Sequence, residues 1–192
     1  MAALIQAAAA EDFPARIVVV VSNRADAGGL ETARASGVPT VTIESKPFGK
    51  DRAAFEAVLQ SALERHQVDL ICLGGFMRLF TAEFVQRWYG RMLNIHPSLL
   101  PSFPGLDPQG QALRAGVKIS GATVHFVIPE TDAGPILMQG AVAVRDDDTP
   151  DALRLVASGA VNLEGDVCKT TASASYDDSL ISPAMLRSEA QK

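Results

Sequence analysis

Asn94, His96 and Asp132 are the residues of this chain whose types and spacing could do chemistry. Asn94 and His96 lie two positions apart at the end of an apolar run, so in a strand their side chains leave from the same face. Pro97 keeps His96 out of the helical region of backbone space, and later prolines stiffen the loop. Asp132 adds a carboxylate on a second short loop. An amide, an imidazole and a carboxylate on restrained loops could move an acyl group onto an amine.

His96 by itself is a weak indicator of catalysis, because a histidine that follows a strand more often has a structural role. The nearby Asn94, the proline-rich loop and Asp132 reverse that preference. The other two histidines are expected to be structural. His66 ends a charged helix, whose carboxyl terminus favours the imidazole cation, and His125 alternates with apolar residues in a strand.

The elements that must position these residues follow from hydrophobic periodicity. The pattern predicts strands over residues 16–22, 40–43, 69–74 and 91–95, helices over 28–36, 51–66 and 82–88, and a strand pair over 122–128 and 136–144. This order predicts an α/β fold: a Rossmann-like, open, mostly parallel sheet with helices on both faces. Ligands of such sheets bind beyond the carboxyl ends of the strands, where Gly74-Gly75 and residues 94–96 fall.

Two helices carry more detailed signals. The helix over 51–66 is expected to place one apolar face against the core, formed by Ala54, Val58, Leu59 and Leu63. A second helix is expected to begin after Asp107 as N-cap, with Pro108 at its first position and Gly116 just past its end.

Composition places the chain in an ordinary class. Its 192 residues are 47% hydrophobic, which is enough for one domain over residues 1–168, followed by a polar and disordered tail over 169–192. A net charge of -5 argues against binding to a nucleic-acid backbone. Cys72 and Cys168 do not suggest a disulfide framework, and neither a leader nor a membrane span is expected, so the cytoplasm is the predicted location.

The run from Asn94 to Pro101, Asn-Ile-His-Pro-Ser-Leu-Leu-Pro, resembles the catalytic signature of the folate-dependent formyltransferases. Three other motifs are similar to those of the branch that acts on glycinamide ribonucleotide in purine synthesis: VSNRADAGGL at 21–30, GGFMRLF at 74–80 and GATVHFV at 121–127. Four motifs in the right order are more specific than any single motif. The resemblance covers roughly residues 1–168.

This resemblance implies the formyltransferase fold, with Asn94, His96 and Asp132 at the reaction centre. It also implies that a formyl group moves from 10-formyltetrahydrofolate to the amine of glycinamide ribonucleotide. The expected folate-binding residues are Met77, Arg78, Leu79, Phe80, Asn94, Ile128 and Asp132. Gly74-Gly75 could merely end a strand, or could let residues 77–80 present backbone groups to the flat pterin ring.

In the mechanism expected from these groups, Asn94 and protonated His96 stabilise the oxyanion that develops on the formyl oxygen. Asp132 favours the charged imidazole or positions a water that relays protons. No metal is expected, because no cluster of His, Cys or carboxylate residues has ligand spacing. The resemblance implies the two small-molecule substrates as partners, and no nucleic acid or membrane partner is expected. The chain is expected to be a monomer or a homodimer.

Three segments depart from the family pattern. Family members begin with a strand and a Gly-rich Ser-Asn loop that holds the substrate phosphate, whereas Met1 here stands in what resembles the following helix. Over residues 148–156 the Asp-Thr-Pro turn is fused to the start of a Leu-Val-Ala-Ser-Gly segment, whereas the family has a further helix between the two. Residues 107–110 stand where relatives usually carry two histidines and an arginine. The sequence therefore predicts a preserved folate half and impaired use of the ribonucleotide.

Two alternatives remain open. One is a 10-formyltetrahydrofolate hydrolase, which uses the same three residues with water as the acceptor. The other is an inactive folate-binding scaffold. An effect of added glycinamide ribonucleotide on the rate of formyl loss from the folate would separate an enzyme from a scaffold.

Overall fold

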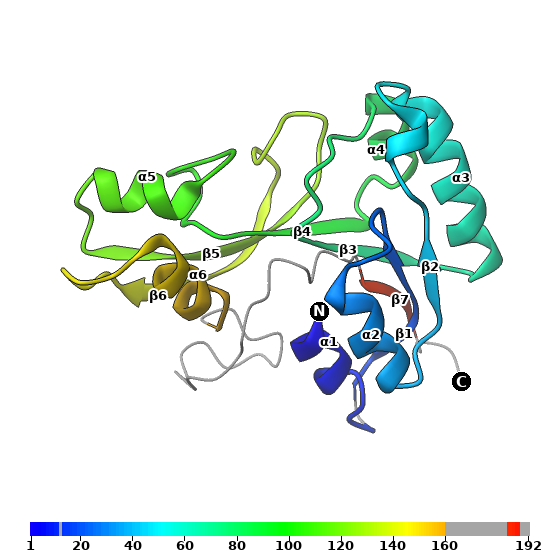
Figure 1. The fold of residues 1–192 in the computed structure, drawn as a ribbon, viewed down its shortest axis with the longest axis horizontal. Helices are drawn as coiled ribbons and strands as arrows, with labels where there is room; N and C mark the ends of the chain where they lie inside the picture. Colours follow the sequence, from blue (N-terminus) through cyan, green and yellow to red (C-terminus); the bar gives the residue numbers. More distant parts are fainter. Residues whose placement is uncertain (12, 160–183, 189–192) are drawn as a thin grey trace. The chain divides into compact units, whose positions relative to one another are not determined.

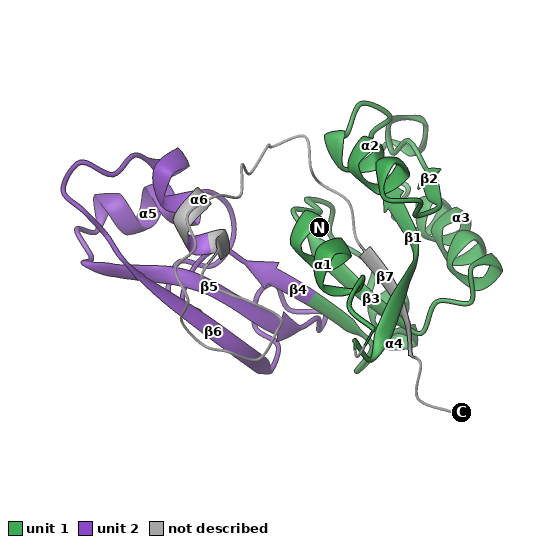
Figure 2. Cartoon of the chain, turned by 90° about the horizontal axis from the view of Figure 1, so that it is seen from below, with its two compact units in different colours: residues 1–93, 177–192 green, residues 94–176 purple. Residues whose placement is uncertain are grey.

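The computed structural model describes residues 1–11, 13–159 and 184–188. They belong to two compact units, residues 1–93 with 177–192 (unit 1) and residues 94–176 (unit 2), drawn in different colours in Figure 2. The chain passes from unit 1 to unit 2 within strand β4 (Met92–His96).

Unit 1 is built on strands β2, β1, β7 and β3, which are neighbours in that order. Its elements along the chain are α1 (Ala2–Ala7), β1 (Ala15–Ser22), α2 (Gly28–Ala35), β2 (Thr40–Thr42), the 3-10 turn η1 (Lys46–Phe48), α3 (Arg52–Arg65), β3 (Leu70–Gly74), α4 (Ala82–Arg87) and β7 (Ala184–Ser188). Figure 1 labels the α-helices and strands among them. Strands β1 and β2 are parallel, and β7 is antiparallel to both β1 and β3. The sheet is therefore mixed.

Strand β1 is the centre of the core of unit 1. Its β-branched run buries Val19 and Val20 completely, and Val20 packs against Leu30 and Ala33 of α2. Helices α3 and α4 are joined by the buried carboxylate of Glu56, which accepts hydrogen bonds from the Thr81 backbone N–H and hydroxyl at 2.7 and 2.5 Å.

Helix α3 buries a face one position away from the predicted one. Its buried residues are Phe55, Glu56, Leu59, Ala62 and Leu63. Leu59 and Leu63 are confirmed as core residues, but the prediction for Val58 is wrong, because its side chain is 42% exposed. The apolar stripe of this helix is broad, and the packing partners decide which edge of the stripe is buried.

Unit 2 contains α5 (Pro108–Arg114), β5 (Ile119–Phe126), β6 (Ile136–Ala143) and α6 (Pro150–Gly159). Strands β5 and β6 form an antiparallel pair from Ile119 opposite Ala143 to His125 opposite Ile136. A core cluster of Ala112, Val142, Leu153 and Ala157 joins α5, β6 and α6. Residues 150–159, where the family pattern predicts two separate segments, form the single helix α6.

The predicted α/β fold and its helices and strands are confirmed. Most element ends differ from the predicted ones by a residue, and β5 begins three residues earlier, at Ile119 instead of 122. Residues 184–188 of the predicted tail form β7, while residues 160–183 and 189–192, which include the predicted domain end at 168, lie outside the described residues. None of the described helices is long and apolar enough to cross a membrane.

Candidate active site

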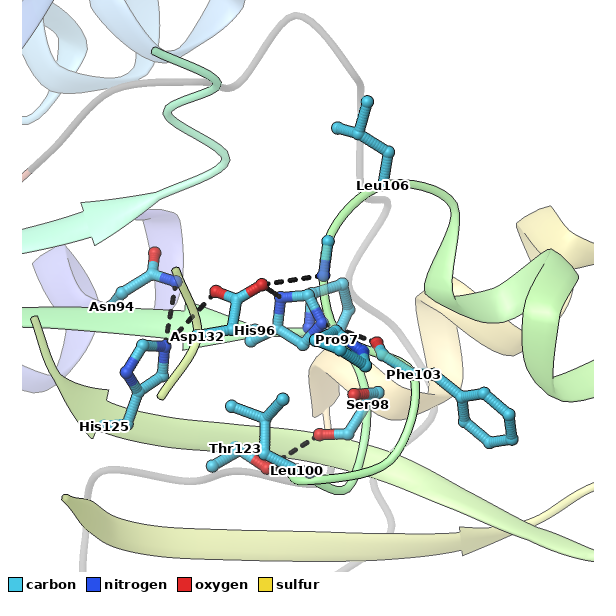
Figure 3. A network of polar contacts seen from close by, with 12 residues as sticks. Asn94, His96, Pro97, Ser98, Leu100, Phe103, Leu106, Thr123, His125 and Asp132 are labelled. Atoms are coloured by element: carbon cyan, nitrogen blue, oxygen red, sulfur yellow. Dashed lines mark hydrogen bonds and ion pairs between the residues drawn. The ribbon is translucent and has the colours of Figure 1, made fainter. Parts of the chain in front are cut away.

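His96 ends strand β4 and is almost fully buried, with 5% of its surface exposed. Its Nε2 lies 3.0 Å from the carbonyl oxygen of Phe103, which can only accept, so this nitrogen carries a hydrogen. Its Nδ1 faces Oδ2 of Asp132 at 3.4 Å (Figure 3). Because acceptors face both ring nitrogens, the doubly protonated imidazolium satisfies both contacts. The surroundings of His96 therefore suit a positive charge.

Asp132 lies on the connection between β5 and β6 with a φ of 52°, a left-handed conformation that Asp tolerates better than most residues. Its Oδ2 also accepts a hydrogen bond from the backbone N–H of Gly105 at 2.8 Å. Its Oδ1 lies 3.7 Å from Nε2 of His125. The carboxylate thus connects His96, His125 and the loop that carries Gly105, all within unit 2.

His125 fixes the orientation of the Asn94 side chain. Nδ1 of His125 lies 3.0 Å from the carbonyl oxygen of Phe126, so this nitrogen carries the hydrogen. Burial lowers the pKa of His125, which leaves Nε2 unprotonated near neutral pH. Nδ2 of Asn94 therefore donates to Nε2 of His125 at 3.2 Å. The second hydrogen of this amide remains available for a substrate.

His125 belongs to this cluster, although its sequence pattern predicts a structural role. It lies two residues after Thr123 near the carboxyl end of β5, so Thr123 and His125 share one face of the strand. A buried polar pair at that end of a strand is the sequence signal that could have indicated a site.

The low pKa of His125 predicts a pH dependence of stability. The unfolded histidine has a pKa of about 6.5 and the folded one a lower value, so the unfolded state binds more protons between these values. The free energy of unfolding should therefore fall as pH decreases below about 6.5. We expect the wild type to lose stability relative to His125→Gln in denaturant titrations taken from about pH 8 to about pH 5. A difference in unfolding free energy between the wild type and His125→Gln that does not change with pH would contradict a lowered pKa of His125.

The loop after His96 is held by buried hydroxyl groups. The Thr123 hydroxyl donates to the Ser98 carbonyl oxygen at 2.7 Å and accepts from the Leu100 N–H at 3.0 Å. The Ser98 hydroxyl donates to the carbonyl oxygen of Ser102 at 2.6 Å. These bonds fix the segment that delivers the Phe103 carbonyl to His96, and Figure 3 shows Ser98, Thr123 and Phe103 near the imidazole.

The residues predicted to contact the folate ring lie in both units. Met77, Arg78, Leu79 and Phe80 lie in unit 1 between β3 and α4, whereas Asn94, Ile128 and Asp132 lie in unit 2. Ile128 is half-buried and follows β5. Met77 and Leu79 are apolar yet 66% and 57% exposed. Exposed apolar side chains of this kind are suited to contact with a flat heterocyclic ligand.

Arg78 and Phe80 are fixed by aromatic contacts within unit 1. The guanidinium carbon of Arg78 lies 5.1 Å from the centre of the Phe55 ring. The ring of Phe80 stacks against Phe76 and Phe84, with ring centres 5.0 and 4.7 Å apart. These contacts give the segment over residues 77–80 a rigid base.

The departure at residues 107–110 has a local structural reason. Asp107 is the N-cap of α5 as predicted, and its Oδ1 accepts from the Gly110 N–H at 3.2 Å. A Cβ atom at position 110 would lie 2.3 Å from Asp107 Oδ2, so glycine permits this close cap. Pro108 at the first helical position and Gly116, with φ of 69°, are also confirmed. The Asp107 cap therefore depends on glycine at position 110.

Other chemistry receives little support from the described residues. Among them, no group of three His, Cys, Asp or Glu residues is close enough to hold a metal ion. Burial raises the pKa of Cys72 to about 11, so this cysteine is a thiol at neutral pH and a poor nucleophile.

Residues 1–157 match the Formyl transferase family, and the chain belongs to that family. The resemblance inferred from the motifs is therefore confirmed. The phosphoribosylglycinamide formyltransferase of Bacillus subtilis is 41% identical over 143 residues, which are 74% of this chain and 73% of that protein. The crystal structure of phosphoribosylglycinamide formyltransferase from Brucella melitensis is 50% identical with a TM-score of 0.74, covering 80% of this chain and 78% of that one.

A longer relative shares the same region. The trifunctional purine biosynthetic protein adenosine-3 of Bos taurus is 46% identical over 175 residues, or 82% of this chain. This chain spans only 17% of that relative's length.

Proposed function

We propose that this chain transfers a formyl group from 10-formyltetrahydrofolate to the amine of glycinamide ribonucleotide, a step of purine biosynthesis. The observation that carries the proposal is the buried contact between His96 and Asp132, beside an Asn94 amide that His125 orients. Membership of the formyl transferase family and the names of the bacterial relatives support the choice of reaction.

In the proposed reaction the amine nitrogen forms a bond to the formyl carbon, and the bond from that carbon to the folate nitrogen breaks. The formyl oxygen carries negative charge between these two events. The remaining N–H of Asn94 and the positive charge of His96 stabilise this oxygen. Both groups are held before substrate binds, so little reorganisation is needed as the charge develops.

The reaction also moves one proton from the amine to the departing folate nitrogen. Oδ2 of Asp132 already accepts a hydrogen bond from the Gly105 N–H and faces His96. Oδ1 lies 3.7 Å from Nε2 of His125, which donates no hydrogen to it, so Oδ1 takes the proton from the amine, directly or through a water. The same carboxylate faces Nδ1 of His96 and orients the imidazole. Asp132 thus has two connected roles, proton relay and support of His96.

The proposed folate-binding residues are Met77, Arg78, Leu79, Phe80, Asn94, Ile128 and Asp132. The exposed side chains of Met77 and Leu79 and the aromatic base beneath Arg78 and Phe80 support the inclusion of residues 77–80. We further propose that the chain acts on small molecules and works in the cytoplasm. The free thiol of Cys72 supports the second point, because thiols stay reduced in that compartment.

Binding of a stable 10-formyl folate analogue tests the folate half of this proposal. A ligand that binds only the native state stabilises it by about 2.7 kcal/mol at a concentration 100 times its dissociation constant, so the melting temperature should rise. Met77→Asp should reduce the shift, because it places a charge where the ring is expected to lie. Ile119→Asp is the matched control, since Ile119 is exposed to a similar extent, 61% against 66% for Met77, and belongs to no proposed site.

The analogue should also shift the melting temperature of His96→Ala, because this variant loses catalytic charge rather than the folate site. No shift in the folded wild type at saturating analogue would overturn the proposed folate site.

A further inference from the structure

Gln139 on β6 anchors the loop that leads to His96. Its Nε2 lies 2.9 Å from the carbonyl oxygen of Leu100 and 3.0 Å from the hydroxyl oxygen of Thr123. A carboxamide nitrogen carries two hydrogens, so these two contacts use both. The pairing of β5 and β6 sets Gln139 directly opposite Thr123, which fixes the position of the carboxamide.

The Thr123 hydroxyl is saturated when Gln139 is in place. It donates to the Ser98 carbonyl and accepts from both the Leu100 N–H and Gln139, which is all that one hydroxyl can do. Thr123 is fully buried and Leu100 is 4% exposed. Gln139 itself is exposed, whereas the two acceptors belong to buried residues. Losing the carboxamide therefore leaves both acceptors without this donor, and the loop must move for them to reach water or another donor.

The anchored loop ends at the proposed active site. After Leu100, the Ser102 carbonyl accepts from Ser98, and the next residue, Phe103, offers its carbonyl oxygen to Nε2 of His96 at 3.0 Å. Displacing the loop moves this oxygen, and with it the imidazole that must meet Asp132. We infer that Gln139 is a positioning residue for His96, an inference that rests on the proposed function.

Gln139→Glu is the sharpest test, because it keeps the side-chain size while its carboxylate cannot donate and faces the Leu100 carbonyl. We expect kcat for formyl transfer to fall about tenfold, with KM for both substrates changed by less than about twofold. The ratio of variant to wild-type activity should rise as pH falls, because a protonated Glu regains one donor. Leu137→Glu is the matched control, since it adds the same charge two residues earlier at a side chain that is 54% exposed.

A double substitution separates positioning from a general loss of structure. In a His96→Ala background, Gln139→Glu should lower kcat by less than about twofold, since the group it positions is gone. A full tenfold loss in that background would overturn the inference. Gln139→Met removes the donors without adding charge, and gives the same expected result if the Glu variant does not fold.

The imidazole NMR signals supply a readout that does not depend on activity. The chain has three histidines. Gln139→Glu should shift the ring signals of His96 and leave those of His66, in unit 1, unchanged. Unchanged His96 signals in the folded variant would contradict the inference even if transfer is normal in the wild type. Failure of the wild type to transfer formyl groups would instead contradict the proposed function, and leave the NMR result to decide the role of Gln139.

Discussion

His96→Ala is expected to lower the rate of formyl transfer by roughly 10²-fold or more, while the affinity for a folate analogue changes little. The imidazole is buried with acceptors facing both ring nitrogens, an arrangement that suits a positive charge opposite the formyl oxygen as it becomes negative. The alanine variant removes that charge and leaves Asp132 without its partner. Single-turnover transfer rates with saturating substrates measure this loss.

Asn94→Ala and Asp132→Ala should lower the transfer rate by a comparable factor. The double variant His96→Ala with Asp132→Ala should lower the rate by far less than the product of the two single factors, because these groups act as a unit. His66→Ala is the matched control, as this histidine caps the end of α3 in unit 1. A near-normal rate in His96→Ala would remove His96 from the mechanism.

Gly134→Ala is expected to destabilise the fold by about 1 to 3 kcal/mol and to reduce transfer at the same time. A Cβ atom at position 134 would lie 1.8 Å from the carbonyl oxygen of Phe126, so the backbone must shift. That same oxygen accepts from Nδ1 of His125, and Gly134 follows Asp132 by two residues. A backbone shift at Gly134 therefore displaces both His125 and Asp132.

Denaturant unfolding of Gly134→Ala, compared with Gly74→Ala, measures the effect on stability. Gly74 has no atom within 4 Å of an added Cβ and no positive φ, so its substitution should change the free energy of unfolding little. Equal free energies of unfolding for the Gly134→Ala variant and the wild type would contradict this prediction, because the connection between β5 and β6 would then accommodate the added methyl group without strain.

Local sequence patterns predicted most of the elements that carry the candidate site. The β-branched run within residues 16–22 predicted β1. Asp107, Pro108 and Gly116 predicted the ends of α5, because such signals act over a few residues. The pairing of β7 with β1 and β3 was not predictable in this way, since it joins segments far apart in the chain.

His125 illustrates the same limit within the site. Its interpretation as a strand residue was correct, but its partner Asn94 lies 31 residues away and Asp132 lies on the next loop. Only the fold brings these side chains together. Val58 shows the complementary limit, because the apolar stripe of α3 is wide enough to be rotated by one position.

The fate of the formyl carbon tests the central proposal most directly. The wild-type chain is incubated with 10-formyltetrahydrofolate labelled at the formyl carbon, with and without glycinamide ribonucleotide, and the label is followed by NMR. The proposed function predicts that the label leaves the folate only when the amine is present and appears in the formamide of the product. Release of the label as formate at the same rate with and without the amine, or label that stays on the folate in both samples, would contradict it.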